Sequence, residues 1–373
     1  MLGATQVGVG YALEQRGFVP DRIIRTSVGA IPGASQPHQP RQRSSWMCDG
    51  LRAENERSAT GATPAQTGAN VEATSDPDPE SGGPEDLEQA AVIFTRVRPR
   101  LFGIAYRMLS SATEAEDVVQ EVWLRWQNYD RSTVINPAAF LATTTTRLAI
   151  NALQSARVRR ETYIGPWLPE PVDTSADPYL GAERGNALEF AVLILMEKLS
   201  PNERAAYVLR EAFDYPYPQI ADILQASEVA ARQMVSRARK HIAGERRTPA
   251  TGAEQRKLLT TFITAARSGD LAALEQLFAA GVTSYSDGNG AVRVSRRPVV
   301  GVSRVAKFIT AIAGWFWVGV EVQWASTNGQ TSALLRRDGT MFAVLTVDAS
   351  AEGIDQVLWM CNPAKITAVS VSD

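Results

Sequence analysis

Histidine and cysteine, on which most metal sites and all disulfides depend, are nearly absent from this chain of 373 residues. The two cysteines, Cys48 and Cys361, lie far apart, and the only histidines are His38 and His241. Their spacing matches no zinc site, so we interpret both cysteines as reduced thiols. We therefore expect no metal ion and no cofactor.

Long apolar runs are also missing. A transmembrane helix needs roughly 18 or more consecutive apolar residues, and the sequence has no such run. The first residues lack the basic stretch and apolar segment of a secretory signal. These absences favour a cytoplasmic location and no membrane partner.

Lysine is scarce, and neither sign of charge is in clear excess. The formal net charge is −2, and only five of the 38 basic residues are lysine. A uniform coating of nucleic acid is therefore disfavoured, but a single basic face is compatible with this total. Arginine suits phosphates and guanine edges, although a GC-rich genome would produce the same preference.

Changes in amino-acid composition and in hydrophobic periodicity divide the chain into segments. Residues 1–88 are rich in small and polar residues, and they lack helix or strand periodicity from residue 35 onward. This predicts a mostly disordered N-terminal extension. Helical periodicity marks residues 89–163 and 187–247, here called the first and second helical domains. Between them, residues 164–186 form a linker rich in proline.

Residues 252–373, here called the C-terminal domain, have a different pattern. Two helices are expected first, followed by strand-like runs such as 318–325 and 341–347. Turn signals separate the runs at Asn328-Gly329, Asp338-Gly339 and Glu352-Gly353. The predicted fold class is multidomain, with two all-α domains followed by an α+β domain.

One helix of the first helical domain has two chemically distinct faces. A capping box of Thr113 and Glu116 predicts its start, and apolar residues at helical spacing form its buried side. The opposite side presents Asp117, Gln120, Glu121 and Arg125. Such a face binds a partner, or it is only a solvated face whose acids suit the helix dipole.

The next helix carries a basic ridge. Asn136-Pro137 predicts its start, with asparagine as the cap and proline at the first helical position. Arg147, Asn151 and Gln154 then share one face, and Arg157, Arg159 and Arg160 continue it. The segment 147–160 contains no carboxylate, which is typical of a surface that follows a nucleic-acid backbone.

A helix-turn-helix is predicted in the second helical domain. Ser200 and Glu203 form a capping box, and a short helix over 218–224 is followed by a tight turn and a helix capped by Ser227. The outward side of that last helix is basic and polar, with Arg232, Gln233, Ser236, Arg237, Arg239 and Lys240. We interpret it as a recognition helix, the alternative being a merely soluble amphipathic helix.

The two helical domains resemble a known family. The run 98–126 looks like region 2 of extracytoplasmic-function (ECF) sigma factors, and the run 199–242 looks like their region 4. The resemblance implies that Asp117, Gln120, Glu121 and Arg125 dock on the β′ clamp helices of core RNA polymerase. It also implies that the loop 129–136 and the ridge from Arg147 to Arg160 engage the minus-10 element of promoter DNA. Residues 232–240 would read the minus-35 element.

The linker and the C-terminal domain resemble a subgroup of these factors with a fused SnoaL-like domain. The linker contains Trp167-Leu168-Pro169-Glu170-Pro171, and the resemblance implies that this motif lies against a DGGGK-like loop. Here the loop consists of Asp287, Gly288, Asn289 and Gly290, followed by Ala291 in place of lysine. A regulatory contact is expected between the two segments, unless the loop is only a hairpin turn.

SnoaL-like proteins have a cone-shaped α+β fold, and some of them are enzymes that use an acidic residue inside the cone. The C-terminal domain has no histidine, so it offers few residues suited to general acid and base catalysis. We expect the domain to sense a small-molecule ligand or to restrain the helical domains, and we do not expect an enzyme.

The first 34 residues resemble the opening of patatin-like serine hydrolases. Ser27 occupies the nucleophile position of a GxSxG motif, but Arg25 replaces the first glycine and the rest of the hydrolase is missing. We interpret this stretch as an inactive remnant.

The predicted function is that of an ECF sigma factor that binds core polymerase and directs promoter recognition, with its activity modulated by the C-terminal domain. One alternative is an enzyme acting through Ser27 or the SnoaL-like cavity. A DNA-binding regulator independent of polymerase is another. The acidic helix followed by a basic ridge favours the sigma factor, because a simple repressor needs neither.

Overall fold

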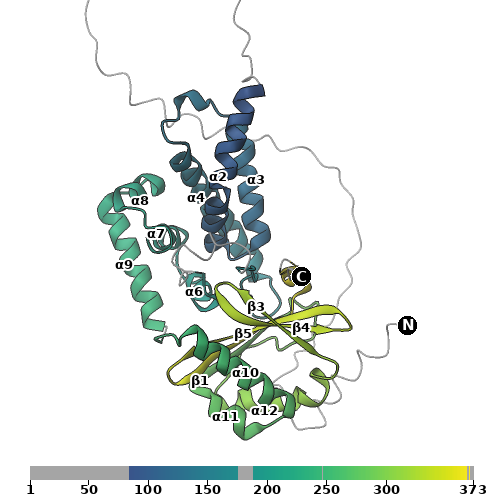
Figure 1. Cartoon of the computed structure of the whole chain (residues 1–373). Coiled ribbons are helices and arrows are strands. Elements are labelled where there is room, and N and C mark those ends of the chain that lie inside the picture. The colour runs from purple at the N-terminus through teal and green to yellow at the C-terminus, as the bar shows by residue number, and fades with distance from the viewer. Residues whose placement is uncertain (1–83, 175–187, 246, 368, 370–373) are drawn as a thin grey trace, which may run out of the picture. The chain divides into compact units, whose positions relative to one another are not determined.

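The computed structural model describes residues 84–174, 188–245, 247–367 and 369 (Figure 1). These residues belong to one compact unit, Ser81–Asp373. The patatin-like stretch 1–34, and all of the predicted N-terminal extension before residue 84, lie outside the described residues. Helix α2 (Pro84–Leu109) begins before the start that we predicted at residue 89.

The first helical domain consists of α2, α3 (Ala112–Gln127), a short 3₁₀ helix η1 (Arg131–Thr133) and α4 (Pro137–Glu161). The predicted cap of α4 is confirmed, because the side chain of Asn136 accepts a hydrogen bond from the Ala139 amide. The predicted cap of α3 is wrong. Ser111, not Thr113, caps this helix, since its hydroxyl accepts from the Glu114 amide while Thr113 already lies in the first turn.

The second helical domain contains α6 (Phe190–Met196), α7 (Pro201–Glu211), α8 (Tyr217–Leu224) and α9 (Glu228–Glu245). Both halves of the predicted capping box of α7 are present, between Ser200 and Glu203. Gln225 ends α8 in the left-handed conformation, and Ser227 caps α9 through the Ala230 amide. The predicted helix-turn-helix is therefore confirmed as a structure.

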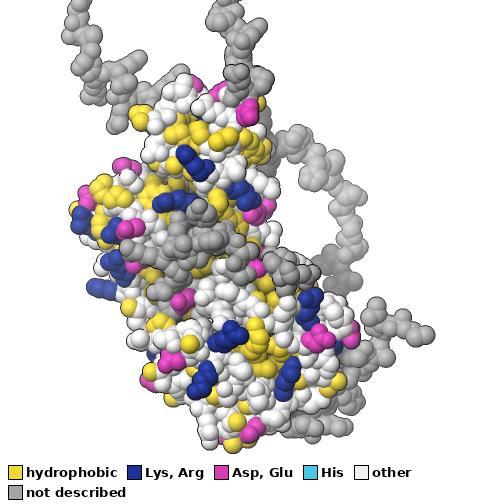
Figure 2. Space-filling model, in the orientation of Figure 1, with side chains coloured by type: hydrophobic (Ala, Val, Ile, Leu, Met, Phe, Trp, Pro, Cys, Tyr) yellow, Lys and Arg dark blue, Asp and Glu magenta, His cyan; other side chains and the backbone are white. Residues whose placement is uncertain are grey.

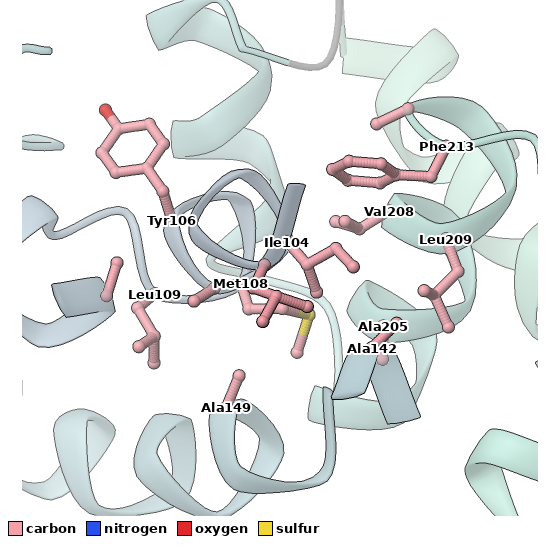
Figure 3. Packing of buried hydrophobic residues seen from close by; sticks show 14 of the residues in the cluster. Ile104, Tyr106, Met108, Leu109, Ala142, Ala149, Ala205, Val208, Leu209 and Phe213 are labelled. Atoms are coloured by element: carbon pink, nitrogen blue, oxygen red, sulfur yellow. The ribbon is translucent and has the colours of Figure 1, made fainter. Parts of the chain in front are cut away.

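The two helical domains share one hydrophobic core. Figure 3 shows Ile104 and Met108 of α2 close to Val208 and Leu209 of α7, and all four side chains are buried. Phe213, which follows α7, packs into the same cluster. The sequence predicts separate domains, whereas burial of this apolar surface holds the two segments against each other.

The C-terminal domain is a six-stranded sheet with helices. It begins with α10 (Gly252–Ser268) and α11 (Leu271–Leu277). The sheet has the order β2-β1-β6-β5-β4-β3, in which β1 and β6 are parallel and the other neighbours antiparallel. Its strands are β1 (Phe278–Asp287), β2 (Val299–Val300), β3 (Glu321–Thr327), β4 (Gln330–Arg337), β5 (Thr340–Ser350) and β6 (Gly353–Met360).

The three predicted turns join neighbouring strands. Asn328 and Gly329 connect β3 to β4, and Asp338 and Gly339 connect β4 to β5, all four with positive φ. This conformation is the one that a two-residue hairpin turn with the native twist requires.

Helix α12 (Val302–Phe316) was not predicted, and α13 (Pro363–Ile366) is a further short helix. Val305, Ala306 and Ile309 of α12 are buried at helical spacing. After the first two helices the sequence predicts strand-like runs and turns, and the β-branched and aromatic residues of α12 have high β propensity. Packing against the sheet overrides that preference, and the predicted strand at 318–325 begins only at Glu321.

The two faces of the sheet are covered by different parts of the chain (Figure 1). Helices α10, α11 and α12 cover one face, where Val357 and Leu345 join their apolar cluster. On the other face, here called the outer face, Leu358 and Met360 pack against Leu168 of the linker and Phe190 of α6. The C-terminal domain therefore contacts both the linker and the second helical domain.

The described helices include none with the length and apolar character needed to cross a membrane.

Candidate nucleic-acid interface and linker contact

The polar face of α3 is directed to solvent. Val118, Val119 and Val122 on the opposite side are buried, whereas Asp117 and Gln120 are exposed. Glu121 accepts a hydrogen bond from Arg125 at 2.8 Å, with about half of each side chain exposed. Because such an exposed ion pair contributes little to stability, it can be exchanged at little cost for contacts with a partner.

The loop between α3 and α4 combines a packed aromatic ring with an exposed apolar side chain. The ring of Tyr129 lies 4.5 Å from that of Phe140, centroid to centroid. Ile135 is fully exposed. The loop is therefore held to α4 through Tyr129, while the apolar side chain of Ile135 is exposed to solvent.

Three arginines of the predicted α4 ridge contact the second helical domain. Arg147 donates to the carbonyls of Ile223 at 3.0 Å and Asp222 at 3.2 Å, at the C-terminal end of α8. Arg157 donates to the carbonyl of Leu199. These carbonyls lie at or near helix ends, where backbone acceptors lack helical partners.

Arg160 is held most closely. Its guanidinium donates to Glu197 and to the Leu109 carbonyl, and it lies 3.6 Å from the ring centroid of Trp167. Arg159, by contrast, is exposed and pairs with Glu114, while Asn151 and Gln154 are exposed as predicted. The segment itself contains no acid, but the tertiary structure brings two carboxylates to it.

Glu197 is shared by two arginines. Arg204, whose side chain is fully buried, donates to Glu197 at 2.5 Å, to the Ser110 hydroxyl at 2.5 Å and to the Arg107 carbonyl at 3.0 Å. Burial alone would raise the pKa of Glu197, but the charges of Arg204 and Arg160 outweigh it and hold this pKa below its ordinary value. This network ties α2 and α4 to the start of α7.

Asp287, at the end of β1, joins the C-terminal domain to the linker. Its buried carboxylate accepts hydrogen bonds from the Leu168 amide at 2.9 Å and from the Tyr163 hydroxyl. Lys365 of α13 donates to the same carboxylate at 2.7 Å and to the Leu168 carbonyl at 2.5 Å. The structure thus brings together two segments that the sequence predicts to meet.

The Lys365 ammonium lies between aromatic rings, 4.2 Å from the centroid of Trp167 and 4.9 Å from that of Tyr163. Burial lowers the pKa of Lys365, and Asp287 opposes this effect. Burial also raises the pKa of Tyr163, and its hydrogen bond to Asp287 adds to the rise. Tyr163 therefore remains a neutral donor to the carboxylate.

The glycine-rich loop after Asp287 contacts the linker, so the alternative that it is only a hairpin turn is wrong. A turn closes between Gly288 and Ala291, within the long connection between the antiparallel strands β1 and β2. Asn289 accepts from the Ile164 amide at 3.4 Å. Gly290 has φ +71°, and a Cβ there would lie 2.9 Å from the Ile164 side chain. The close approach explains the glycine.

Glu170 of the linker contacts the first helical domain. Its buried carboxylate accepts from the Ser111 hydroxyl at 2.8 Å and from the Thr113 amide at 3.1 Å, at the N-terminus of α3. A carboxylate is favoured there by the helix dipole and the unpaired amides. Pro169 and Pro171 on either side are buried.

Asn328 connects three parts of the chain. Its side-chain oxygen accepts from the Val172 amide at 2.9 Å, and its side-chain nitrogen donates to the Tyr106 hydroxyl at 2.6 Å and the Leu188 carbonyl at 3.1 Å. Tyr106 in turn donates to the Glu170 carbonyl at 2.5 Å. A residue predicted only as a turn former thus joins the sheet, the linker and α2.

Helix α9 has the predicted amphipathic arrangement. Its buried side contains Ala231, Met234, Val235, Ala238 and Ile242. The six predicted recognition residues Arg232, Gln233, Ser236, Arg237, Arg239 and Lys240 are all exposed. Figure 2 shows basic side chains along the edge formed by α9, with acidic ones among them.

The arginines of α9 are paired with carboxylates. Arg237 contacts Glu203 at 2.7 Å, and Arg239 contacts Glu211 at 2.6 Å. Arg232 pairs with Glu228, and its guanidinium lies 4.8 Å from the ring centroid of Tyr217. These three arginine side chains are about half exposed, so a phosphate can replace their carboxylate partners at little cost in free energy.

Among the described residues, no cluster of His, Cys, Asp or Glu is arranged to hold a metal ion. Cys361 is a buried free thiol, and burial raises its pKa to about 12, which makes it unreactive. Cys48 lies outside the described residues.

Comparison with known proteins relates these helices to a family. Residues 93–159 match the family described as Sigma-70 region 2, and residues 190–242 match Sigma-70, region 4. The ECF RNA polymerase sigma factor SigJ of Mycobacterium tuberculosis H37Rv is 34% identical over 288 residues, covering 74% of this chain and 92% of that protein. The probable ECF RNA polymerase sigma factor SigI of the same organism is 29% identical over 273 residues, covering 72% and 92%. The crystal structure of SigJ aligns with a TM-score of 0.61 at 30% identity, over 77% of this chain and all of SigJ.

The chain belongs to the family of ECF RNA polymerase sigma factors.

As an ECF sigma factor, it binds core RNA polymerase and directs promoter recognition. Region 2 covers most of α2 together with α3 and nearly all of α4, and region 4 covers α6 to α9 except for the last residues of α9. Its relatives are transcription factors, which favours a regulator over an enzyme.

Sequence reasoning missed several residues of this sigma factor that the structure places in central contacts. They are Tyr106, Tyr163, Glu197, Arg204, Asn328 and Lys365. Each partner lies far away in the sequence or in another helix, so no local pattern identifies the contact. The one local signal was Glu197, an acid directly after the apolar run 190–196, because a charge that is buried requires a partner.

Proposed function

We propose that this ECF sigma factor uses α3 to dock on the polymerase clamp, α4 and the loop 129–136 to engage the minus-10 element, and α9 to read the minus-35 element. We further propose that its C-terminal domain, SnoaL-like and without enzymatic activity, restrains these surfaces through the linker. The observation that carries the restraint is that Arg160 is largely buried between Glu197, the Leu109 carbonyl and Trp167 of the linker.

The minus-35 assignment is supported by the exposed basic side of α9. A recognition helix enters the major groove with its N-terminal part and contacts phosphates with later basic residues. Arg232 and Gln233 lie in the first half of α9, and Arg239 and Lys240 lie further along. Their exposure and their order along the helix fit this division.

The docking assignment is supported by the two acids of α3. Asp117 and Glu121 lie one turn apart on the solvent-facing side, where Glu121 pairs with Arg125. Two accessible acids suit a basic partner surface.

The restraint is supported by a chain of contacts from the sheet to α4. Asp287 binds the Leu168 amide, the neighbouring Trp167 ring stacks on Arg160, and Arg160 is paired with Glu197 of the second helical domain. An arginine held in this way exchanges its protein partners for phosphate only if the linker or region 4 moves. The C-terminal domain therefore favours an arrangement in which part of the minus-10 surface is occupied.

Run-off transcription with purified chain, core polymerase and the factor's own promoter tests the proposal. Asp287→Asn removes the charge that holds Lys365 and weakens the contact with Leu168, so we expect several-fold more transcript than from the unaltered chain. Asp338→Asn is the matched control, because Asp338 is exposed in a turn that asparagine also adopts.

An unchanged transcript level from folded Asp287→Asn protein would refute the restraint. A double variant, Pro169→Ala with Glu170→Ala, acts on the other side of the linker, and its transcript level should change in the same direction. Loss of transcript from the unaltered chain and from a version lacking the C-terminal domain would refute the assignment of the three surfaces.

A further inference from the structure

A cavity of about 440 Å³ opens between the linker and the C-terminal domain. It is lined by residues 165–168 of the linker, Ile194 of α6, Tyr285 of β1, and Arg296 and Pro298 of the connection to β2. Its volume lies within the range of roughly 300–1,000 Å³ typical of small-molecule sites. It has the size for a ligand of modest molecular weight.

The walls of this cavity are apolar and aromatic. Pro166, Leu168, Ile194 and Pro298 contribute aliphatic surface, and Trp167 and Tyr285 contribute rings. Rings and prolines together favour a flat apolar body, which makes extensive contact with them at little entropic cost.

The polar groups of the cavity are all hydrogen-bond donors or neutral. They are the Arg296 guanidinium, the Tyr285 hydroxyl and the Trp167 indole nitrogen, and no Asp or Glu lines the cavity. None of the three groups has a hydrogen-bonding partner among the residues that the structure describes, and Arg296 is exposed there. A cation and two neutral groups, with no carboxylate among the lining residues, favour an anion.

A second cavity provides a contrast. It measures about 170 Å³ and is lined by Glu114, Arg159, Arg160 and Glu170, among other residues. Its arginines are already paired with carboxylates, Arg159 with Glu114 and Arg160 with Glu197. Neither arginine is left free to attract an anion, and the volume lies below the range typical of small-molecule sites.

We propose that the larger cavity binds a small amphiphilic anion, a carboxylate or sulfonate on a flat aromatic body, with the acid group on Arg296. The site lies on the outer face of the sheet, where Tyr285 joins the cluster of Leu168 and Leu358. It is therefore separate from the face that α10 and α12 cover.

The position of the site couples the ligand to the linker. Trp167 and Leu168, which line the cavity, are the residues that stack on Arg160 and bind Asp287. A bound ligand therefore changes the free energy of the linker contact. This effect on transcription rests on the proposed function, whereas binding itself does not.

Titration of the full chain with the fluorescent aromatic sulfonate 8-anilinonaphthalene-1-sulfonate tests the site. We expect saturable binding that Arg296→Gln weakens about tenfold, because the variant loses the charged hydrogen bond to the sulfonate. Arg297→Gln is the matched control, because it removes the same charge from the next, also exposed residue, which does not line the cavity. Equal weakening by both variants, or no saturable binding, would overturn the proposal.

Competition experiments distinguish the contribution of the ligand's acid group to binding from that of its aromatic ring. 1-Naphthoate should displace the probe about tenfold more effectively than the neutral 1-naphthalenemethanol, and this preference should vanish in Arg296→Gln. Ile194→Trp, which fills the cavity, should abolish probe binding without lowering the melting temperature. If that variant does not fold, the comparison of Arg296→Gln with Arg297→Gln decides the matter alone. Equal displacement by both competitors would overturn the assignment of an anion.

Discussion

Helices α4 and α9 both carry arginines that the family resemblance assigns to DNA, but the two helices hold them differently. On α9, Arg237 and Arg239 pair with carboxylates while more than half of each side chain is exposed. On α4, Arg160 is only 13% exposed and bonds to a shared carboxylate, a backbone carbonyl and an aromatic ring. Phosphate can reach the arginines of α9 directly, as it can the exposed Arg159 of α4, whereas Arg160 must first be released.

This difference suggests that the two promoter elements are recognised under different constraints. Exchange of one exposed ion pair for another changes the free energy little. Loss of a buried ion pair is costly because it leaves a charge without a partner. On the proposed assignments, the α9 surface for the minus-35 element is accessible in the free protein, whereas Arg160 of the proposed minus-10 surface is held by the linker and region 4.

The largest effect is expected from breaking the buried network. Glu197→Ala leaves Arg204, which is fully buried, without its carboxylate, and should lower the free energy of unfolding by about 3 kcal/mol. Urea denaturation measures this change. Glu114→Ala, which removes the partner of the exposed Arg159, should lower it by less than about 1 kcal/mol. Similar losses of stability in both variants would show that the buried and the exposed ion pairs do not differ in their contribution.

A charge reversal on α9 should affect DNA binding and not folding. Arg237→Glu places an acid beside Glu203 and against the DNA, so affinity for a minus-35 duplex should fall about 30-fold, or ~2 kcal/mol. Fluorescence anisotropy measures the affinity, and binding to core polymerase should stay unchanged. An equal loss of core binding would count against the assigned role.

Acid should weaken the network around Glu197. Because the pKa of Glu197 is held below its ordinary value of 4.5, its ionised form stabilises the folded state above that pH. The stabilisation is lost as the pH falls through the lower pKa of the folded state. The advantage of the unaltered chain over Glu197→Gln in denaturation experiments should therefore shrink as the pH drops below about 4.5. A constant advantage down to pH 3 would contradict this cause.

The smallest effect is expected at the start of α9. Glu228→Gln removes an exposed partner of Arg232 and should change the free energy of unfolding by less than about 0.5 kcal/mol. Affinity for the minus-35 duplex should rise about twofold at low salt, because a carboxylate near the phosphates is removed. Weaker binding would show that Glu228 orients Arg232 instead of competing for it.

Much of the helical structure could be predicted from short stretches of sequence. The caps at Asn136 and Ser200 and the buried stripe of α9 involve residues within a few positions of each other. The same applies to the turns at Asn328 and Asp338, whose residue types tolerate positive φ. The error at Thr113 is equally local, since Ser111 offers the same capping chemistry two residues earlier.

The helix α12 and the partners of the arginines could not be predicted in this way. The β-branched residues of α12 have a strand preference that only burial against the sheet reverses. The ridge of α4 is free of acids in sequence, yet Glu114 of α3 and Glu197, directly after α6, pair with its arginines. Periodicity predicts which side of a helix is polar, but not what lies opposite.

Local sequence was sufficient to predict the order of the domains, the starts of α4, α7 and α9 and the basic side of α9, because neighbouring residues decide capping and periodicity. Only the tertiary structure decided that Lys365 takes up the buried charge of Asp287, that Asn328 joins three segments, and that Arg160 is occupied. Buried polar groups need partners, and the packing of distant segments decides which partners they find.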